Sequence, residues 1–394
     1  MVSFCKERAQ TSIDLMVQMM QNNSKHLYRI GLYGAKNHGK SCFLAALGCL
    51  RQVNPRKHVC RRLPHTSSKE LENSDALERG YDWVEKAENL LMNAQVPPAT
   101  PIGEEPIALR YQFTFADKRK ADIELIDYSG ELLSSDIQTG IQAEDLRRRM
   151  DEMDAIFVLA PYPIDGEANS MPKELNDLGS VFSLLQADKN KDYPPIPIAL
   201  VVNKWDRRDS TDPQDYEAQL LALKTFFEDE EASGAYLTLH NQLSGFSKNK
   251  ENFSCFPLSS FGEHSNIKGI DVPKLEGADS GKDSCLSSFG MEDPFAWAID
   301  RRDEIDREEM ERQAEGTMLL SKWNPCRIQA IWEDARKTSQ SCQNLRIRYP
   351  QDDERLQSSA TLVGKLRRLK RQATLIFLAY LYLTWSVTDL AIGW

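Results

Sequence analysis

The chain has 394 residues and a formal net charge of −10, which disfavours general electrostatic binding to nucleic acid or to anionic membranes. This length suits one large α/β domain with an appendage, and we expect the partners to be proteins rather than nucleic acid. The eight cysteines include no Cys-x-x-Cys pair and residues 1–24 show no export signal, so we expect a cytoplasmic protein.

Two segments lie on either side of the first predicted strand, loop and helix, at residues 27–50. Residues 12–20 have apolar residues at helical spacing, which predicts an amphipathic helix within an N-terminal region, 1–26. Residues 51–100 are polar and charged, and they predict an insertion that contains one helix, over residues 68–92. We therefore expect the main domain to begin at residue 27 and to carry this insertion.

The first functional signal lies at residues 34–41, with the sequence Gly-Ala-Lys-Asn-His-Gly-Lys-Ser. An apolar run at 27–33 predicts a buried strand before it, and residues 42–50 predict a helix after it. This is the setting that a GxxxxGKS phosphate-binding loop requires. The predicted nucleotide contacts here are Gly34, Asn37, His38, Gly39, Lys40, Ser41 and Cys42.

The chemistry of this loop follows from its residue types. Gly34 and Gly39 let the backbone curl so that successive N–H groups point towards an anion. Lys40 can reach the outer phosphates, and the Ser41 hydroxyl can bind Mg²⁺ at the positive end of the following helix. The loop therefore predicts a nucleotide triphosphate site.

Residues 107–115 and 123–126 have the β-rich alternation of a hairpin. The second strand ends in Asp127-Tyr128-Ser129-Gly130-Glu131, a DxxG pattern at the carboxyl end of a strand. A carboxylate at Asp127 can hold the Mg²⁺ shell, and the Gly130 N–H can contact a terminal phosphate. The pattern has weight because it follows a strand and comes after the phosphate loop.

Two further buried strands are predicted at 155–160 and 196–202, with a helix at 173–185 between them. Asn203-Lys204-Trp205-Asp206 follows the second strand directly. The Asp206 carboxylate can accept hydrogen bonds from N1–H and the exocyclic amine of guanine, which adenine cannot supply, while the Lys204 stem covers the base. This tetrapeptide therefore predicts selection of GTP over ATP.

The last elements of the predicted domain follow in order. A helix is expected at 216–227, a strand at 253–258, a long loop at 263–290 and a closing helix at 294–312. Ser259 and Ser260 follow the sixth strand, and their small side chains suit backbone contact with a base. The expected fold is α/β, with a six-stranded, mainly parallel sheet and helices on both faces.

With these three motifs in this order, each at a strand end, the chain resembles the P-loop GTPases of the translation-factor-related (TRAFAC) class. The resemblance covers residues 27–312, within a predicted domain at 27–315. Thr100, Glu131 and the Asp-Pro-Phe at 293–295 are similar to features of GTPase-like proteins of bacterial conflict systems, which implies a role in bacterial defence.

The resemblance implies roles for individual residues. Lys40 and Ser41 would bind phosphates and Mg²⁺, Asp127 would bind the Mg²⁺ shell, and Gly130 the terminal phosphate. The guanine contacts would be Asn203, Lys204 and Asp206. Thr100 is the candidate for the mobile threonine that closes on Mg²⁺, with Thr66 as its competitor; Lys40, Thr100, Glu131 and Asn37 form the predicted catalytic set.

Two residues depart from the commonest pattern of the class. Glu131 stands where many small GTPases have glutamine, so hydrolysis is expected to be slow, to use another group or to require a partner. Asn37 in GxxNxGKS resembles the asparagine with which cation-dependent GTPases hold K⁺; the alternative is that it simply shapes the loop. The expected cofactors are GTP or GDP, Mg²⁺ and, in the first case, K⁺.

Residues 316–394 form a predicted helical region beyond the nucleotide domain. Five basic residues within 365–371 precede a largely apolar run at 373–388. This run is either a buried helix or subunit interface, or a membrane-proximal segment on the cytoplasmic side. Three functions remain open: a GTP-hydrolysing enzyme, a GTP-dependent scaffold that recruits a protein, and a membrane-associated assembly.

Overall fold

The computed structural model describes residues 27–35, 38–49, 58–64, 74–97, 107–116, 118–127, 148–162, 175–176, 178–179, 182, 195–208, 216–247, 249–262, 264–267, 270–276, 285–306 and 308. The predicted N-terminal helix, most of the helix predicted at 173–185, and the whole C-terminal region 316–394 lie outside these residues. Within the described part of the chain, no helix is long and apolar enough to cross a membrane.

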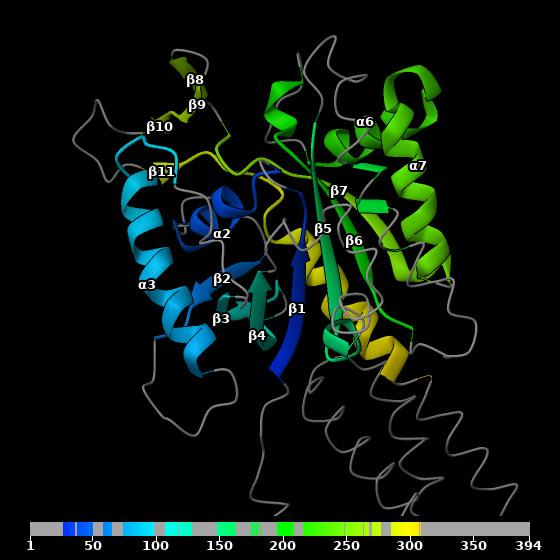
Figure 1. Cartoon of the computed structure of the whole chain (residues 1–394), viewed down its shortest axis with the longest axis horizontal. Helices are drawn as coiled ribbons and strands as arrows, with labels where there is room; N and C mark the ends of the chain where they lie inside the picture. The colour runs from blue at the N-terminus through cyan, green and yellow to red at the C-terminus, as the bar shows by residue number, and fades with distance from the viewer. Residues whose placement is uncertain are drawn as a thin grey trace, which may run out of the picture.

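A seven-stranded sheet lies at the centre of the fold, in the order β2-β3-β4-β1-β5-β6-β7 (Figure 1). The strands β4, β1, β5, β6 and β7 are mutually parallel, whereas β3 runs antiparallel to both β2 and β4. The predicted α/β fold with a mainly parallel sheet is confirmed. The strand bounds are β1 Leu27–Tyr33, β2 Val59–Arg62, β3 Ile107–Thr114, β4 Lys120–Asp127, β5 Ala155–Pro161, β6 Ile198–Asn203 and β7 Phe253–Pro257.

The sheet has one strand more than the six predicted, because β2 forms inside the insertion at 51–100. As the edge strand it pairs with β3 from Val59 opposite Thr114 to Arg62 opposite Tyr111. Its four residues include two arginines, and so short a run carries no recognisable alternation. Pairing with an existing strand edge, rather than local pattern, decides that this segment is a strand.

Helices flank the sheet on both faces. In Figure 1, α3 lies beside the end of the sheet formed by β2 and β3, and α6 and α7 lie beside β6 and β7. A further helix covers residues 293–306, and the loop predicted at 263–290 contains two small antiparallel sheets. The bounds are α2 Lys40–Cys49, α3 Ser74–Leu91, α6 Tyr216–Glu228, α7 Glu230–Phe246, β8 His264–Ile267, β9 Ile270–Pro273, β10 Leu275–Glu276 and β11 Cys285–Leu286.

The central strands are buried on both faces, and β5 shows this clearly. All seven of its residues are buried. Phe157 and Leu159 belong to the core beneath α2, α3 and the helix at 293–306, whereas Ile156 and Val158 belong to the core beneath α6 and α7. Since side chains alternate along a strand, an apolar run of this kind requires cover on both sides of the sheet.

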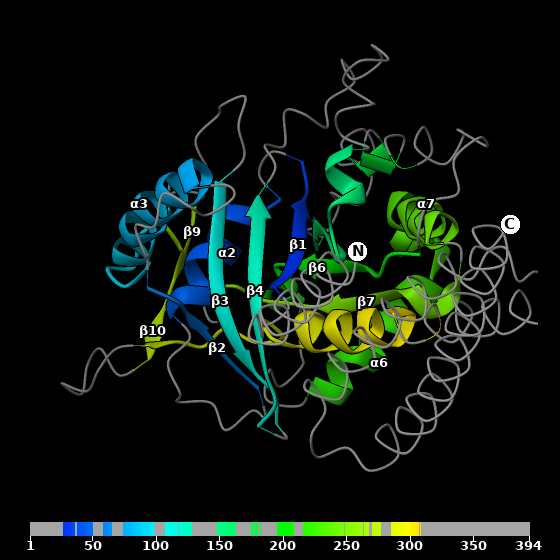
Figure 2. The same cartoon turned by 90° about the horizontal axis from the view of Figure 1, so that it is seen from below.

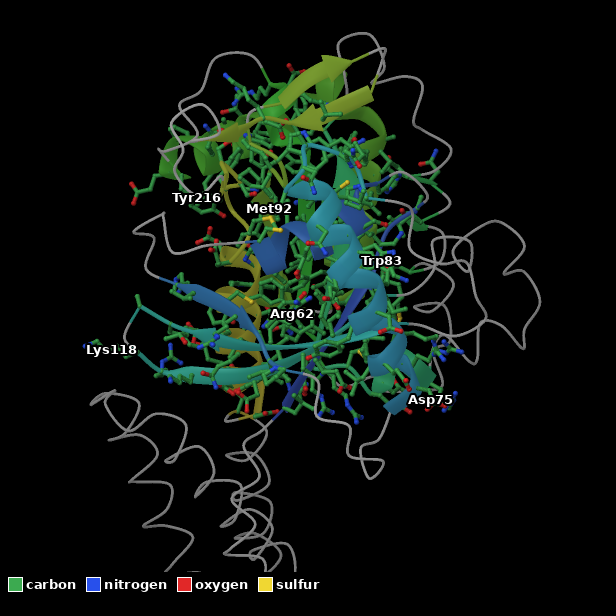
Figure 3. All side chains as sticks on the ribbon, turned by 90° about the vertical axis from the view of Figure 1, so that its left-hand side faces the viewer. Arg62, Asp75, Trp83, Met92, Lys118 and Tyr216 are labelled. Atoms are coloured by element: carbon green, nitrogen blue, oxygen red, sulfur yellow. The ribbon has the colours of Figure 1, made fainter. Side chains whose placement is uncertain are left out.

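The predicted hairpin is formed by β3 and β4, paired from Ile107 opposite Asp127 to Thr114 opposite Lys120. Lys118 adopts a left-handed φ of 68° in its turn. Figure 3 shows Lys118 at the edge of the molecule and α3 crossing the same view. The second strand of the hairpin, β4, ends at Asp127, which is one of the predicted site residues.

The helix at 293–306, yellow in Figure 2, joins the sheet to α2. Phe295 is fully buried and its ring stacks against Phe43 of α2 with centroids 6.1 Å apart. The same ring meets Phe157 of β5 edge-on at 4.9 Å, and Tyr28 of β1 donates a hydrogen bond of 2.6 Å to Asp303. This helix therefore holds α2 against the strand that precedes the phosphate loop.

Replacing Phe295 by alanine removes the ring that α2 and β5 share. We expect Phe295→Ala to lower the free energy of unfolding by about 3–5 kcal/mol, because a large aromatic side chain leaves a cavity in a packed core. Leu221→Ala on α6 is the control, since Leu221 is 66% exposed and its truncation should change stability by less than about 0.5 kcal/mol. Urea unfolding followed by circular dichroism measures both variants against the parent. The same urea midpoint in Phe295→Ala and in the parent would contradict this packing role.

Candidate nucleotide site

The loop between β1 and α2 has the backbone that its glycines predict. A Cβ on Gly34 would lie 2.9 Å from the carbonyl oxygen of Leu159, and a Cβ on Gly39 would lie 2.3 Å from the Asn203 side-chain amide. Gly39 also has a φ of +88°, which L side chains rarely adopt. Of the two predicted contacts between these glycines, His38 is fully buried, and Asn37 lies outside the described residues.

Lys40 begins α2 and is almost entirely buried. Its ammonium donates hydrogen bonds to the carbonyl oxygens of Gly34 at 2.5 Å and Ala35 at 3.3 Å, so the charge sits inside the loop. Burial lowers the pKa of Lys40 below its ordinary value, and the Asp127 carboxylate acts in the opposite direction. The structure therefore places the cation where the loop's N–H groups and the helix N-terminus also favour an anion.

Asp127 is the last residue of β4 and is buried. In the parallel pairing of β1 with β4 it lies opposite Leu32, two residues before Gly34. Ser41, in the first turn of α2, is half-buried. The structure thus brings the predicted Mg²⁺ ligands Ser41 and Asp127 to the same edge of the sheet, whereas Thr100, Thr66, Gly130 and Glu131 lie outside the described residues.

Asn203 connects the phosphate loop to the loop after β6. Its side-chain nitrogen donates a hydrogen bond of 3.4 Å to the carbonyl oxygen of His38. Its side-chain oxygen accepts from the Lys204 backbone N–H at 2.8 Å and from the Ser260 hydroxyl at 3.2 Å. Asn203 is only 1% exposed. Three hydrogen-bond partners, from three places in the sequence, therefore orient its side-chain amide.

Asp206 and Ser259 meet at the same edge. The Ser259 hydroxyl donates to one Asp206 carboxylate oxygen and accepts from the Gly262 N–H at 2.8 Å. Lys204 has a left-handed φ of 58°. It lies near Cys42: burial raises the pKa of the Cys42 thiol to about 11, and the positive charge of Lys204 acts in the opposite direction. The predicted base contacts and the predicted loop contacts therefore form one continuous site.

Trp205 anchors this turn, a role that the sequence analysis did not assign. The side chain is 1% exposed, and its indole nitrogen donates to Gln219 of α6 at 2.7 Å. Its backbone N–H donates to the carbonyl oxygen of Leu258 at 3.0 Å, which joins this loop to the one that carries Ser259. The sequence did contain a signal for this role: Trp205 is a large aromatic residue between two charged ones, and such a side chain is usually buried.

Several solved structures are similar to this chain. The S. cerevisiae Ski7 GTPase-like domain, bound to GDP and inorganic phosphate, matches with 12% identity and a TM-score of 0.32, over 62% of this chain and 45% of that chain. The Arl6 BBS3 small GTPase of Trypanosoma brucei, with bound GppNp, matches with 11% identity and a TM-score of 0.29, over 71% and 99%. The signal recognition particle receptor SRb-GTP/SRX complex of Chaetomium thermophilum gives 13% and 0.31, over 60% and 93%.

This chain spans less than half of the Ski7 chain. No curated protein matches the chain. A family model described as Double-GTPase 2 does match, over residues 28–267. This is more than half of the 394 residues, and it includes the phosphate loop, Asp127 and residues 203–206. Guanine-nucleotide binding follows from the family, and the chain, with its P-loop GTPase fold, belongs to the Double-GTPase 2 family.

Proposed function

We propose that the chain binds GTP with Mg²⁺ and hydrolyses it to GDP, so that the bound nucleotide acts as a switch. The observation that carries the proposal is the hydrogen bond from the Asn203 amide to the His38 carbonyl oxygen. It joins the loop beside Lys40 to the loop that carries Asp206. A nucleotide spanning these loops would have its phosphates at the N-terminus of α2 and its base beside Asp206.

Ser41 and Asp127 suit a Mg²⁺ ion. Mg²⁺ prefers oxygen ligands, keeps several waters and is bound by one or two protein groups together with substrate phosphates. One hydroxyl and one buried carboxylate at the phosphate end meet that requirement. Ser41 would hold the ion directly and Asp127 through water; the ion would supply neutralisation of the charge on the phosphate oxygens.

The base end of the site favours guanine. Asp206 presents carboxylate oxygens, which are acceptors, and guanine offers two donors, N1–H and the exocyclic amine. Ser259 donates to one of these oxygens, so the carboxylate is held by a protein partner. Adenine lacks both donors and would leave these acceptors without partners, which costs affinity.

The hydrolysis step requires a water in line with the terminal phosphate. The water oxygen attacks the γ-phosphorus, the bond to the β–γ bridging oxygen breaks, and GDP and inorganic phosphate leave. Lys40 would stabilise the charge that develops on the phosphate oxygens, since its ammonium lies inside the loop. Thr100, Glu131 and Asn37 remain the predicted residues for closing on the ion, positioning the water and binding K⁺.

A GTP-dependent scaffold is the alternative. Glu131 favours it, because this chain has glutamate at the position where many small GTPases have the glutamine that orients the attacking water. In that case GTP would order residues near Thr100 and Glu131, and these would recruit a protein partner with little turnover. Association with the inner face of a membrane through residues 365–394, oligomerisation and a role in bacterial defence stay predictions.

The bridge between the two loops can be tested with Asn203→Ala. We expect GDP affinity to fall by roughly 10-fold or more, because the variant loses three hydrogen bonds and leaves buried polar groups without partners. Asn249→Ala is the control, since Asn249 is exposed and its side chain bonds Glu251, away from the site. Titration calorimetry with GDP gives both affinities; unchanged binding in Asn203→Ala would count against a nucleotide that spans the two loops.

Lys40→Ala tests the chemistry. Release of phosphate from GTP should fall by roughly 10²-fold or more, because the variant removes a cation from the position of the developing charge. Lys224→Ala on the exposed face of α6 should keep the parent rate. If the parent chain binds GTP in preference to ATP but releases no phosphate, the scaffold replaces the enzyme; a parent rate that survives in Lys40→Ala would exclude this site as the catalytic one.

Asn37→Ala tests the K⁺ prediction. The parent should hydrolyse GTP faster in KCl than in NaCl at equal ionic strength, because an asparagine oxygen can help hold K⁺ against the phosphates. The variant should show the same rate in both salts. Phosphate release by the two proteins in the two buffers is the measurement, and a parent that is indifferent to the cation would leave Asn37 as a residue that shapes the loop.

A further inference from the structure

The pentapeptide Leu-Ser-Ser-Phe-Gly occurs twice in the chain, at residues 258–262 and 286–290. The first copy follows β7 and carries the predicted base contacts Ser259 and Ser260. The second copy begins with the last residue of β11 and leads into the helix at 293–306. The family match ends at residue 267, so the second copy lies beyond the residues that the family model matches.

The two copies pair with one another in a self-complementary register. Ser259 and Phe289 form an antiparallel bridge, in which each backbone N–H donates to the other residue's carbonyl oxygen at 3.1 Å. This register sets the first residue of one copy against the last of the other. Ser260 and Ser288, the third residues of each copy, therefore face one another at the centre of the pair.

The glycines keep the two copies in close contact. Gly262 and Gly290 share the same left-handed φ of 68°. A Cβ on Gly262 would lie 2.2 Å from the Ser287 carbonyl oxygen, and a Cβ on Gly290 would lie 2.3 Å from the Pro257 carbonyl oxygen. Because backbone oxygens cannot move aside as a flexible side chain can, the approach of the second copy requires Gly262, and the approach of Pro257, which directly precedes the first copy, requires Gly290.

Hydrogen bonds run from the second copy, through the first, to the base contacts. The Ser288 hydroxyl donates to the Ser260 carbonyl oxygen at 2.6 Å. The hydroxyls of the first copy then donate onward, from Ser260 to Asn203 and from Ser259 to Asp206. Ser288 is 6% exposed and the serines of the first copy are less exposed still, so these bonds lie out of water.

We propose that the second Leu-Ser-Ser-Phe-Gly segment, residues 286–290, is part of the guanine-recognition apparatus and that Ser288 is its positioning residue. Ser288 fixes the backbone from which Ser259 and Ser260 orient the Asp206 carboxylate and the Asn203 amide. This inference rests on the proposed function, since it takes Asp206 as the group that reads the base. It adds a specificity-determining segment outside the predicted motifs.

The inference predicts a change in base discrimination, not only in stability. IDP keeps the N1–H of guanine but lacks the exocyclic amine, so the ratio of IDP to GDP dissociation constants reports how well Asp206 meets that amine. A variant that is merely less stable binds both nucleotides less well in equal proportion. A variant that loosens the carboxylate lowers the ratio itself.

Ser288→Ala in the full-length chain is the experiment, with GDP and IDP affinities measured by titration calorimetry. The ratio should fall by roughly three- to tenfold, the size expected for one buried hydrogen bond, towards the value of Asp206→Ala. Ser288→Cys, which keeps the shape of the side chain but has only a weak donor, should lower the ratio as well. The control is Ser247→Ala, whose hydroxyl also bonds backbone carbonyl oxygens, at 2.8 and 2.9 Å, but near the other end of β7.

Each outcome separates this inference from the proposed function. A lowered ratio in both Ser288 variants with an unchanged ratio in Ser247→Ala supports it. An unchanged ratio in both Ser288 variants, with discrimination intact in the parent and lost in Asp206→Ala, would overturn the role of residues 286–290 and leave the proposed function standing. A parent that binds GDP and IDP equally well would contradict the role of Asp206, and this inference would fall with it.

Discussion

The parallel arrangement of β1, β4 and β6 is the constraint on which the site depends. Their carboxyl ends meet at one edge of the sheet, so Gly34, Asp127 and Asn203 come together although they are far apart in the sequence. The strands end at different positions along this edge: Tyr33 ends β1 opposite Val158, whereas β6 continues to Asn203 opposite Pro161. Because β6 extends further at this edge, the loop that follows it begins beside the loop after β1, and the Asn203 amide reaches the carbonyl oxygen of His38.

The segment from residue 286 to residue 306 joins both ends of the nucleotide site. At its start Ser288 bonds the loop that carries Ser259 and Ser260, and further on Phe295 packs on Phe43 of the helix that begins with Lys40. Backbone pairing fixes the first contact and aromatic packing the second. A single continuous stretch of chain therefore contacts both the loop that carries Ser259 and Ser260 and the helix that begins with Lys40.

Buried, hydrogen-bonded polar groups fix the geometry of this edge. The Asn203 amide and Ser259 hydroxyl are almost completely buried, and each has partners on more than one segment. A buried polar atom left without a partner costs more free energy than a satisfied bond contributes, so such a network tolerates few arrangements. The Trp205 side chain contributes in another way, because its burial against α6 holds the turn that presents Asp206.

Much of the fold could be predicted because it depends on the local periodicity of apolar residues and on the order of motifs along the chain. The apolar runs of β1, β5 and β6, the β3–β4 hairpin and the loop ending in Lys40 each follow from a few consecutive residues. The edge strand β2, the burial of Trp205 and the pairing of Ser259 with Phe289 could not be read in this way. These features depend on contacts between distant segments, and only the folded sheet decides which segments meet. The repeated Leu-Ser-Ser-Phe-Gly is visible in the sequence alone, but its meaning lies in the antiparallel register that tertiary structure imposes.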